Sequence, residues 1–351
     1  MKKIIVVFMI VFATAHSTKA QDGIENILFA QTSDAEKLGG AYLEPFAKGL
    51  MYGMNNGWYH TAKVHKTFGF DISIRGNFSA FPSDAETFNV AALGLSSRIT
   101  ANPVTSPTIG GSQNAMANGY QVTIEENSDQ NINGGLHPRI QRNFTMADGK
   151  QDDFPLKSIP TPVVQLNLGL PADFEVSLRF LPTSSTDDYE AGLFGLGLKK
   201  EITNWFGPLD KLPLHVSLMG AFTNMKVNYN IADPSGNEIN ITDGVTEFKL
   251  NSYMVQALAS LNFPIINVYG GLGYTGGTSS LKMKGTYVID YNTLLPNTEK
   301  TLIDPINLDY NNAGFRTTLG ARLSLGFFKI YGDYTLQEYN TLSLGVAFSL
   351  R

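Results

Sequence analysis

The sequence predicts an all-β protein, a transmembrane antiparallel up-and-down β-barrel of ten strands with a short, partly helical N-terminal segment. Three observations favour this class: two-residue alternation of apolar side chains, alternation of short and long connections, and the composition. Glycine (34), phenylalanine (22) and tyrosine (15) are abundant, while charged residues make up only 16%. In a barrel, lipid-facing and lumen-facing residues alternate and cancel in any average, so weak overall hydropathy is expected.

The alternation is clearest at the C-terminal end of the chain. Leu342, Leu344, Val346, Phe348 and Leu350 share one parity, and the residues between them are small or polar. The two preceding segments, 315–327 and 328–337, repeat the pattern. An apolar face about 10 residues long matches a tilted strand that crosses the bilayer core. A periplasmic β-sandwich has a similar composition but rarely sustains alternation over this length.

The same periodicity predicts seven strands upstream, which gives ten in all. They lie at 68–81, 163–170, 174–180 and about 190–199, 212–229, 250–263 and 266–275. Tight turns at 171–173, 262–264 and 326–327 alternate with long polar connections at 82–160, 230–249 and 276–310, which we expect to be outer loops. The barrel then occupies 68–351. Further strands in 82–160, for instance around Tyr120, Val122 and Ile124, would come in pairs and give 12 or 14.

The N-terminal residues have the pattern of a secretory signal peptide over 1–20. Lys2 and Lys3 precede the apolar run 4–15, and small residues end at Ala20, so we expect cleavage after Ala20. A run of about 12 residues is too short for a spanning helix, which needs about 20. Removal of three lysines and no acid would lower the formal charge from −5 to −8. The mature chain is therefore acidic, which excludes a basic nucleic-acid-binding protein.

The segment 21–67 does not alternate. Ser33, Asp34, Ala35 and Glu36 have the spacing of a helix-capping box, and the stretch that follows reads as a short amphipathic helix ending in the glycine-rich residues 49–57. One interpretation is a plug folded inside the barrel, with Met54, Asn55, Asn56 and Trp58 as candidate plug residues. A periplasmic tail and an additional strand at 48–58 are the alternatives.

Motifs for catalysis or cofactor binding are not found in the sequence. There is no cysteine, so disulfides, thiolate metal sites and a lipidated cysteine are excluded. The histidines of the mature chain have no metal-ligand spacing, and a nucleophilic pair of His215 with Ser217 is improbable because residues two apart on any strand face the same way. We therefore predict no enzyme, no metal and no cofactor.

Strand parity directs a set of charged side chains into the lumen. The candidate lumen-lining residues are Asp71, Arg75, Glu175, Arg179, Arg316, Arg322, Lys329 and Asp333. The excess of bases could select acidic or amphipathic solutes. The alternative is that these charges pair across strands and fill a small barrel as a polar core. Aromatic residues near strand ends, including Trp58, Tyr59, Trp205 and Tyr339, fit interfacial girdles.

Three stretches give the chain a resemblance to a family of outer-membrane proteins of unknown function from gliding and gut Gram-negative bacteria. They are Gly53–Lys63, Pro162–Pro182 and Gly195–Lys200. More remotely, the design resembles the long-chain fatty-acid transporter (FadL-like) barrels, which have an N-terminal hatch in the lumen and usually 14 strands. That resemblance implies passage of hydrophobic molecules.

Two functions are open from the sequence. The first is passage or binding of hydrophobic or amphipathic small molecules past an N-terminal plug, and the second is a non-conducting structural or surface-interaction barrel. Ten strands enclose a lumen filled by side chains, whereas 12 to 14 leave a cavity. In either case we expect the bacterial outer membrane as the location. The expected partners are membrane lipid and, through the C-terminal strand, the barrel-assembly machinery.

Overall fold

The computed structural model describes residues 25–101, 105–112, 119–125, 139–185, 189–231, 238–291 and 299–350. The predicted signal peptide and its cleavage site lie outside these residues.

Ten antiparallel strands form a closed ring. They are β1 (Phe70–Ala80), β7 (Ser158–Leu170), β8 (Phe174–Ser185), β9 (Tyr189–Glu201), β10 (Leu214–Asn230), β11 (Ile239–Asn262), β12 (Ile266–Asp290), β14 (Ile306–Leu325), β15 (Phe328–Leu336) and β16 (Thr341–Leu350). Each strand pairs with its neighbours in the sequence of barrel strands, and the pairing of β1 with β16 joins the two ends. The predicted up-and-down barrel of ten strands is confirmed.

The outer surface of the ring carries the apolar residues of each alternating strand. On β14, Phe315, Leu319 and Leu323 are exposed, whereas Arg316 and Thr318 between them are buried. A closed barrel with an apolar exterior and a polar interior is the arrangement of a transmembrane barrel. Among the described residues, no helix is both long and apolar enough to cross a membrane.

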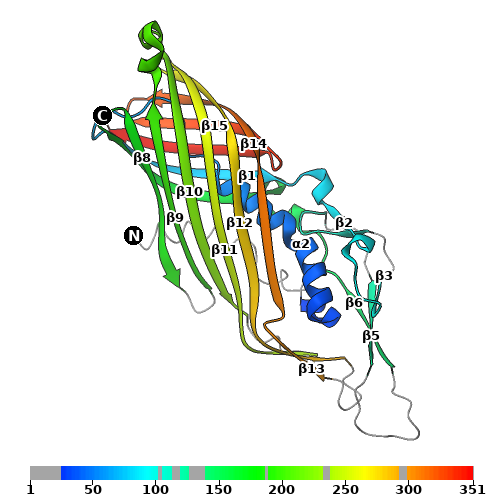
Figure 1. The fold of residues 1–351 in the computed structure, drawn as a ribbon. Helices are drawn as coiled ribbons and strands as arrows, with labels where there is room; N and C mark the ends of the chain where they lie inside the picture. Colours follow the sequence, from blue (N-terminus) through cyan, green and yellow to red (C-terminus); the bar gives the residue numbers. More distant parts are fainter. Residues whose placement is uncertain are drawn as a thin grey trace, which may run out of the picture.

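The barrel wall is much taller on one side than on the other (Figure 1). Strand β12 has 25 residues and β11 has 24, whereas β15 has 9 and β16 has 10. The ranges 239–249 and 276–290 are therefore strand, and their prediction as outer loops was wrong. Beyond the lipid belt neither face has to be apolar, so the alternation fades although the backbone pairing continues. A short strand, β13 (Glu299–Ile303), pairs with the outer end of β12.

The described residues of the connection 82–157 form two small sheets of their own at the long-loop end. Strand β2 (Thr87–Asn89) pairs with β4 (Thr105–Pro107), while β5 (Gly119–Glu125) pairs with β3 (Ile99–Ala101) and β6 (Arg139–Thr145). None of these strands joins the ring, so the alternatives of 12 or 14 barrel strands are wrong. Single-turn 3-10 helices lie at η2 (Ser83–Ala85), η3 (Ala91–Leu93), η4 (Gln151–Asp153) and η5 (Pro155–Lys157), and η6 (Thr203–Lys211) connects β9 to β10.

The N-terminal segment is more helical than the sequence predicted. A 3-10 helix η1 (Glu25–Ala30) leads directly into α2 (Gln31–Met54). The predicted capping box does not form, because Ser33 lies inside the helix and Asp34 instead accepts hydrogen bonds from the backbone N and the side-chain Oγ of Ser96.

Two glycines of the predicted helix end lie within the helix and allow its close approach to the wall. A Cβ atom on Gly49 would lie 2.3 Å from Ile159 Cδ1, and one on Gly53 would lie 2.5 Å from Thr161 Oγ1. The prediction that the helix ends in the glycine-rich residues 49–57 is confirmed, because α2 ends at Met54. Gly49 and Gly53 themselves lie inside the helix, where the missing side chain serves close packing rather than a turn.

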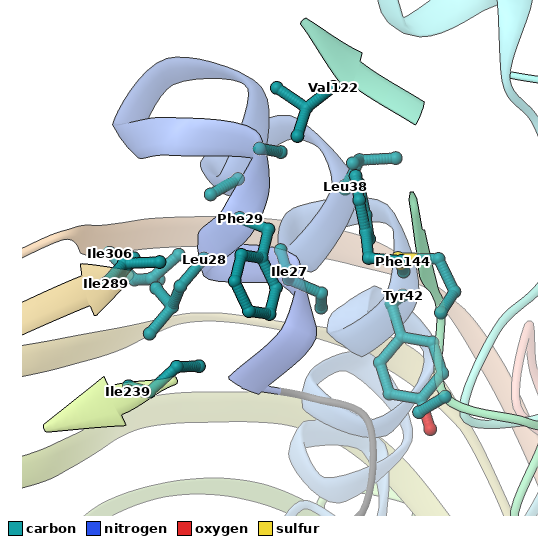
Figure 2. Packing of buried hydrophobic residues seen from close by; sticks show 14 of the residues in the cluster. Ile27, Leu28, Phe29, Leu38, Tyr42, Val122, Phe144, Ile239, Ile289 and Ile306 are labelled. Atoms are coloured by element: carbon teal, nitrogen blue, oxygen red, sulfur yellow. The ribbon is translucent and has the colours of Figure 1, made fainter. Parts of the chain in front are cut away.

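One apolar core joins the start of the N-terminal segment to the tall wall and to the outer loop. Ile27, Leu28 and Phe29 pack toward Ile239, Ile289 and Ile306 at the strand tips, and Leu38 and Tyr42 pack toward Val122 and Phe144 (Figure 2). Burial of this apolar surface stabilises the three parts as one unit. We call this unit, residues 25–48 with the described residues of 82–157 and the strand tips, the outer assembly.

Candidate functional site: the barrel interior

The last turn of α2 and the residues that follow pass through the ring toward the start of β1. We call residues 50–65 the internal segment. Leu50, Tyr52, Asn56, Trp58 and Ala62 are all buried. The segment thus runs from the outer assembly to the end of the barrel that holds the tight turns and the C-terminal strand end.

Every barrel strand contributes a side chain that contacts the internal segment. The contacting residues are Arg75 (β1), Gln165 (β7), Arg179 (β8), Lys199 (β9), Ser217 (β10), Ser260 (β11), Thr275 (β12), Arg316 (β14), Tyr331 (β15) and Ser349 (β16). A segment touched from all ten strands is enclosed by them. These residues lie on the inward parity of their strands. Several of them, such as Gln165 and Ser217, are not among the candidate lumen residues, and strand parity is the only sequence signal that could have identified them.

Arg179 and Arg316 bind carbonyls at the C-terminal end of α2, and Arg75 binds carbonyls of the chain just beyond it. Arg179 donates to Met54 O and Asn56 O, both at 2.8 Å. Arg316 donates to Asn55 O at 2.7 Å, and Arg75 donates to Tyr59 O at 3.0 Å and also to Gly57 O.

The last carbonyls of a helix have no partner within the helix and carry partial negative charge, so cations are favoured there. None of the three arginines forms an ion pair with a carboxylate in the described part of the chain. The excess of bases therefore binds backbone carbonyls of the internal segment rather than acids across the strands.

Trp58 packs beneath the guanidinium of Arg179. The Cζ atom of Arg179 lies 3.7 Å from the ring centroid, and the tryptophan is only 1% exposed. Gly195 and Gly197 of β9 make room for the indole, because a Cβ on either would lie about 3 Å from it. The placement of Trp58, Tyr59 and Tyr339 in interfacial girdles was wrong, since all three are buried. Trp205 is exposed, as a girdle residue would be.

The carboxylates occupy the half of the lumen nearer the tight turns. Asp71 Oδ2 lies 3.0 Å from His60 Nε2 and 3.3 Å from His65 Nε2. Glu175 pairs with Lys199 at 2.7 Å and with His65 Nδ1 at 2.7 Å. Glu175 and Lys199 are direct cross-strand partners of β8 and β9, which is the pairing across strands that the alternative interpretation expected.

The remaining candidates are more dispersed. Asp333 is buried and accepts a hydrogen bond from Tyr269 Oη at 2.9 Å. Arg322 Nη1 lies 2.9 Å from His60 Nδ1. Lys329 donates to Gly326 O at 2.6 Å in the tight turn, so it lies at the rim and apart from the other candidates.

The candidate plug residues all belong to the enclosed stretch. Asn55 donates from Nδ2 to Thr275 Oγ1 at 2.6 Å, and the Asn56 side chain accepts from Arg316 and donates to Tyr52 O at 2.8 Å. Met54 contributes its backbone carbonyl to Arg179 and buries its side chain in the apolar cluster beside Leu50. These amides cross-link the internal segment to β12 and β14.

Among the described residues, His215 and Ser217 do not form the nucleophilic pair considered from the sequence. His215 Nδ1 lies 2.6 Å from Glu201 Oε1, and Ser217 donates to Ala62 O, so the two side chains serve different partners. Within the described ranges no group of three or more histidine and acidic residues could hold a metal ion.

The comparison with protein families decides the chain's family. Residues 1–350 match a family described as "Family of unknown function (DUF6588)". The chain belongs to this family. No curated protein matches the chain.

Solved outer-membrane proteins show low-scoring similarity to this DUF6588 member. Ail, the attachment invasion locus protein of Yersinia pestis, has 8% identity, covers 81% of this chain and 100% of its own, and has a TM-score of 0.26. The outer-membrane protease OmpT from Escherichia coli has 9% identity, 81% and 94% coverage and a TM-score of 0.26. The translocator domain of NalP from Neisseria meningitidis has 12% identity, 81% and 89% coverage and a TM-score of 0.23.

Proposed function

We propose that this DUF6588 protein is a closed, non-conducting barrel of the bacterial outer membrane whose N-terminal segment plugs the lumen and holds the outer assembly at the cell surface. The observation that carries the proposal is the set of contacts from all ten strands to the internal segment. A lumen crossed by a hydrogen-bonded segment leaves solutes no open path.

The outer assembly supports a surface role. The first half of helix α2 is bound by the outer loop, because Lys37 donates to Gly94 O at 2.5 Å and Tyr42 donates to Asp148 O at 2.9 Å. Its end is bound by the barrel wall, where Arg179 donates to Met54 O. On the other side of the helix Tyr310 of β14 donates to Gly40 O at 3.1 Å. The internal segment and the outer assembly are therefore joined through α2, so the segment that fills the lumen also anchors the outer assembly to the barrel.

Conductance in planar bilayers tests this function. The intact protein should give no channels, because the internal segment fills the ring. A variant lacking residues 31–62 should give channels that favour anions, since Arg75, Arg179 and Arg316 would then line the lumen without their carbonyl partners. The control is the triple variant of these arginines to glutamine in the deletion background, which should lose the anion preference.

Channels from the intact protein equal to those of the deletion variant would contradict closure. Passage of hydrophobic or amphipathic molecules, which the fatty-acid transporter resemblance implies, stays a prediction. Uptake of a hydrophobic fluorescent probe by cells with and without the protein tests it directly. The outer-membrane location, cleavage after Ala20 and recognition of β16 by the assembly machinery belong to the same proposal.

A further inference from the structure

Four adjacent strands of the tall wall change from apolar to polar at one level on their outward face. Phe222, Tyr253, Tyr274 and Phe315 form an exposed aromatic row across β10, β11, β12 and β14. One outward step further on β10 and β11, Asn224 and Asn251 replace them, and Asn224 donates to Asn251 Oδ1 at 2.7 Å. Asn311 of β14, two outward steps beyond Phe315, pairs with Thr278 beside Asn251 and continues the polar row. Aromatic rings mark the membrane interface, so the polar row begins at the level of the lipid headgroups.

A groove of about 380 Å³ opens in this polar face, directly above the aromatic row. Its lining includes Lys249, Asn251, Thr278, Ser280, Asp309 and Asn311. Small hydroxyl side chains on β12 lie between longer ones on β11 and β14, which hollows the wall. Amide, hydroxyl and carboxylate groups of this kind bind the hydroxyl groups of sugars.

A cluster of lysines borders the groove on the same outward face. Lys226, Lys249 and Lys284 all lie within 4.0 Å of a single carboxylate, that of Glu247, and each lysine side chain is 47–49% exposed. Three lysines and one glutamate leave a net charge of +2, or +1 when Asp309 of the groove is included, in a chain whose formal charge is −5. The cluster therefore attracts anions to a place where the protein as a whole repels them.

We infer that the groove and the lysine cluster bind the headgroup of a phosphorylated glycolipid in the outer leaflet. The lysines would neutralise the phosphates and the groove would receive the sugar, while the acyl chains lie against the aromatic row. Lys249 lies four residues beyond Tyr253, or about 10 Å higher on a strand tilted by about 40°, which is within reach of a large headgroup. The inference goes beyond the closed-barrel function and needs only that the long-loop end faces outward.

Lipid binding to the purified full-length protein, measured by native mass spectrometry in detergent, tests the inference. The probe is a bisphosphorylated glucosamine-disaccharide lipid, compared with phosphatidylglycerol and phosphatidylethanolamine. We expect the glycolipid to bind at least tenfold more tightly than phosphatidylglycerol. The double variant Lys226→Gln/Lys249→Gln should weaken it by about 25-fold, at about fivefold for each lysine.

The control variant is Lys157→Gln, which removes an exposed lysine also paired with an acid, Asp152, but away from the groove. It should leave the affinity unchanged. Heat-dependent gel migration verifies that each variant is folded, and the single variant Lys284→Gln, with an expected loss of about fivefold, replaces the double variant if the latter misfolds. Equal binding of phosphatidylglycerol, or an affinity that the lysine variants do not change, would overturn the inference.

Discussion

Substitution of Arg179 tests most sharply how the internal segment is held, because most contacts of the Arg179 side chain are with that segment. It donates to two backbone carbonyls of the segment and to Gln165 Oε1 at 2.9 Å, and it stacks on Trp58. In Arg179→Ala, Met54 O and Gln165 Oε1 lose the donor that Arg179 supplies, while Asn56 O keeps only the hydrogen bond from Asn77 Nδ2 at 3.4 Å. Each such loss costs about 1–3 kcal/mol, and the cation–π contact adds about 1–2 kcal/mol.

Part of this cost is offset, because the substitution also removes a buried cation that has no carboxylate partner. We therefore expect a net loss of about 3 kcal/mol in the free energy that docks the segment, which is about two orders of magnitude in the docking equilibrium. The barrel strands should stay paired, since their backbone ladder does not involve this side chain.

Tryptophan fluorescence measures this docking. The chain has two tryptophans, and Trp205→Phe leaves Trp58 as the only reporter. Its emission should be blue-shifted and resistant to acrylamide in the parent, and red-shifted and easily quenched once Arg179→Ala is added. Phe180→Ala, a lipid-facing substitution on the same strand, is the control and should leave Trp58 protected. Equal quenching of Trp58 with and without Arg179 would refute the reasoning.

Three further predictions concern facing, helix contact and the outer assembly. Leu319→Arg, on the lipid face, should lower the free energy of unfolding in bilayers by about 2–4 kcal/mol, whereas Asn311→Arg on the same face above the belt should cost less than about 1 kcal/mol; equal costs would contradict the assigned membrane level. Gly53→Ala should expose Trp58 to quencher, because the new Cβ would lie 2.5 Å from Thr161 Oγ1. Gly40→Ala meets only Leu308 Cδ2 at 3.5 Å and should stabilise α2 by about 0.5–1 kcal/mol. Exposure of Trp58 in Gly40→Ala but not in Gly53→Ala would show that the helix does not pack tightly against the wall. Ile27→Ala should cost about 2–5 kcal/mol and speed proteolysis of 82–157 while Trp58 stays protected, and unchanged proteolysis would argue against a shared outer core.

The ring was predictable because each strand in the lipid belt must show a strict period of two. The alternate apolar residues from Leu342 to Leu350 therefore indicate a lipid-facing side, and the same argument located all ten strands. The outer halves of β11 and β12 were missed because Thr278, Ser280 and Lys249 face water and carry no apolar signal. Their strand structure depends on pairing with neighbours, which one sequence does not display.

The interior was predictable in its residue types but not in its partners. Parity pointed Arg75, Arg179 and Arg316 inward, whereas their bonding to the carbonyls at and just beyond the end of α2 depends on where a distant segment docks. The packing role of Gly49 and Gly53 was not predictable for the same reason: in a sequence, a glycine needed for close approach resembles one that lies at a helix end. Only the position of Ile159 and Thr161 against the helix distinguishes the two.

The central claim is that the internal segment lies inside the barrel in the membrane, and a disulfide across the interior tests it most directly. The natural chain has no cysteine, and Thr61 Oγ1 lies 3.2 Å from Ser260 Oγ of β11. In Thr61→Cys/Ser260→Cys we expect a spontaneous disulfide in outer membranes of intact cells, identified by mass spectrometry of the linked peptides, with neither thiol reacting with a maleimide. Two free, separately labelled thiols in a folded barrel would contradict the account.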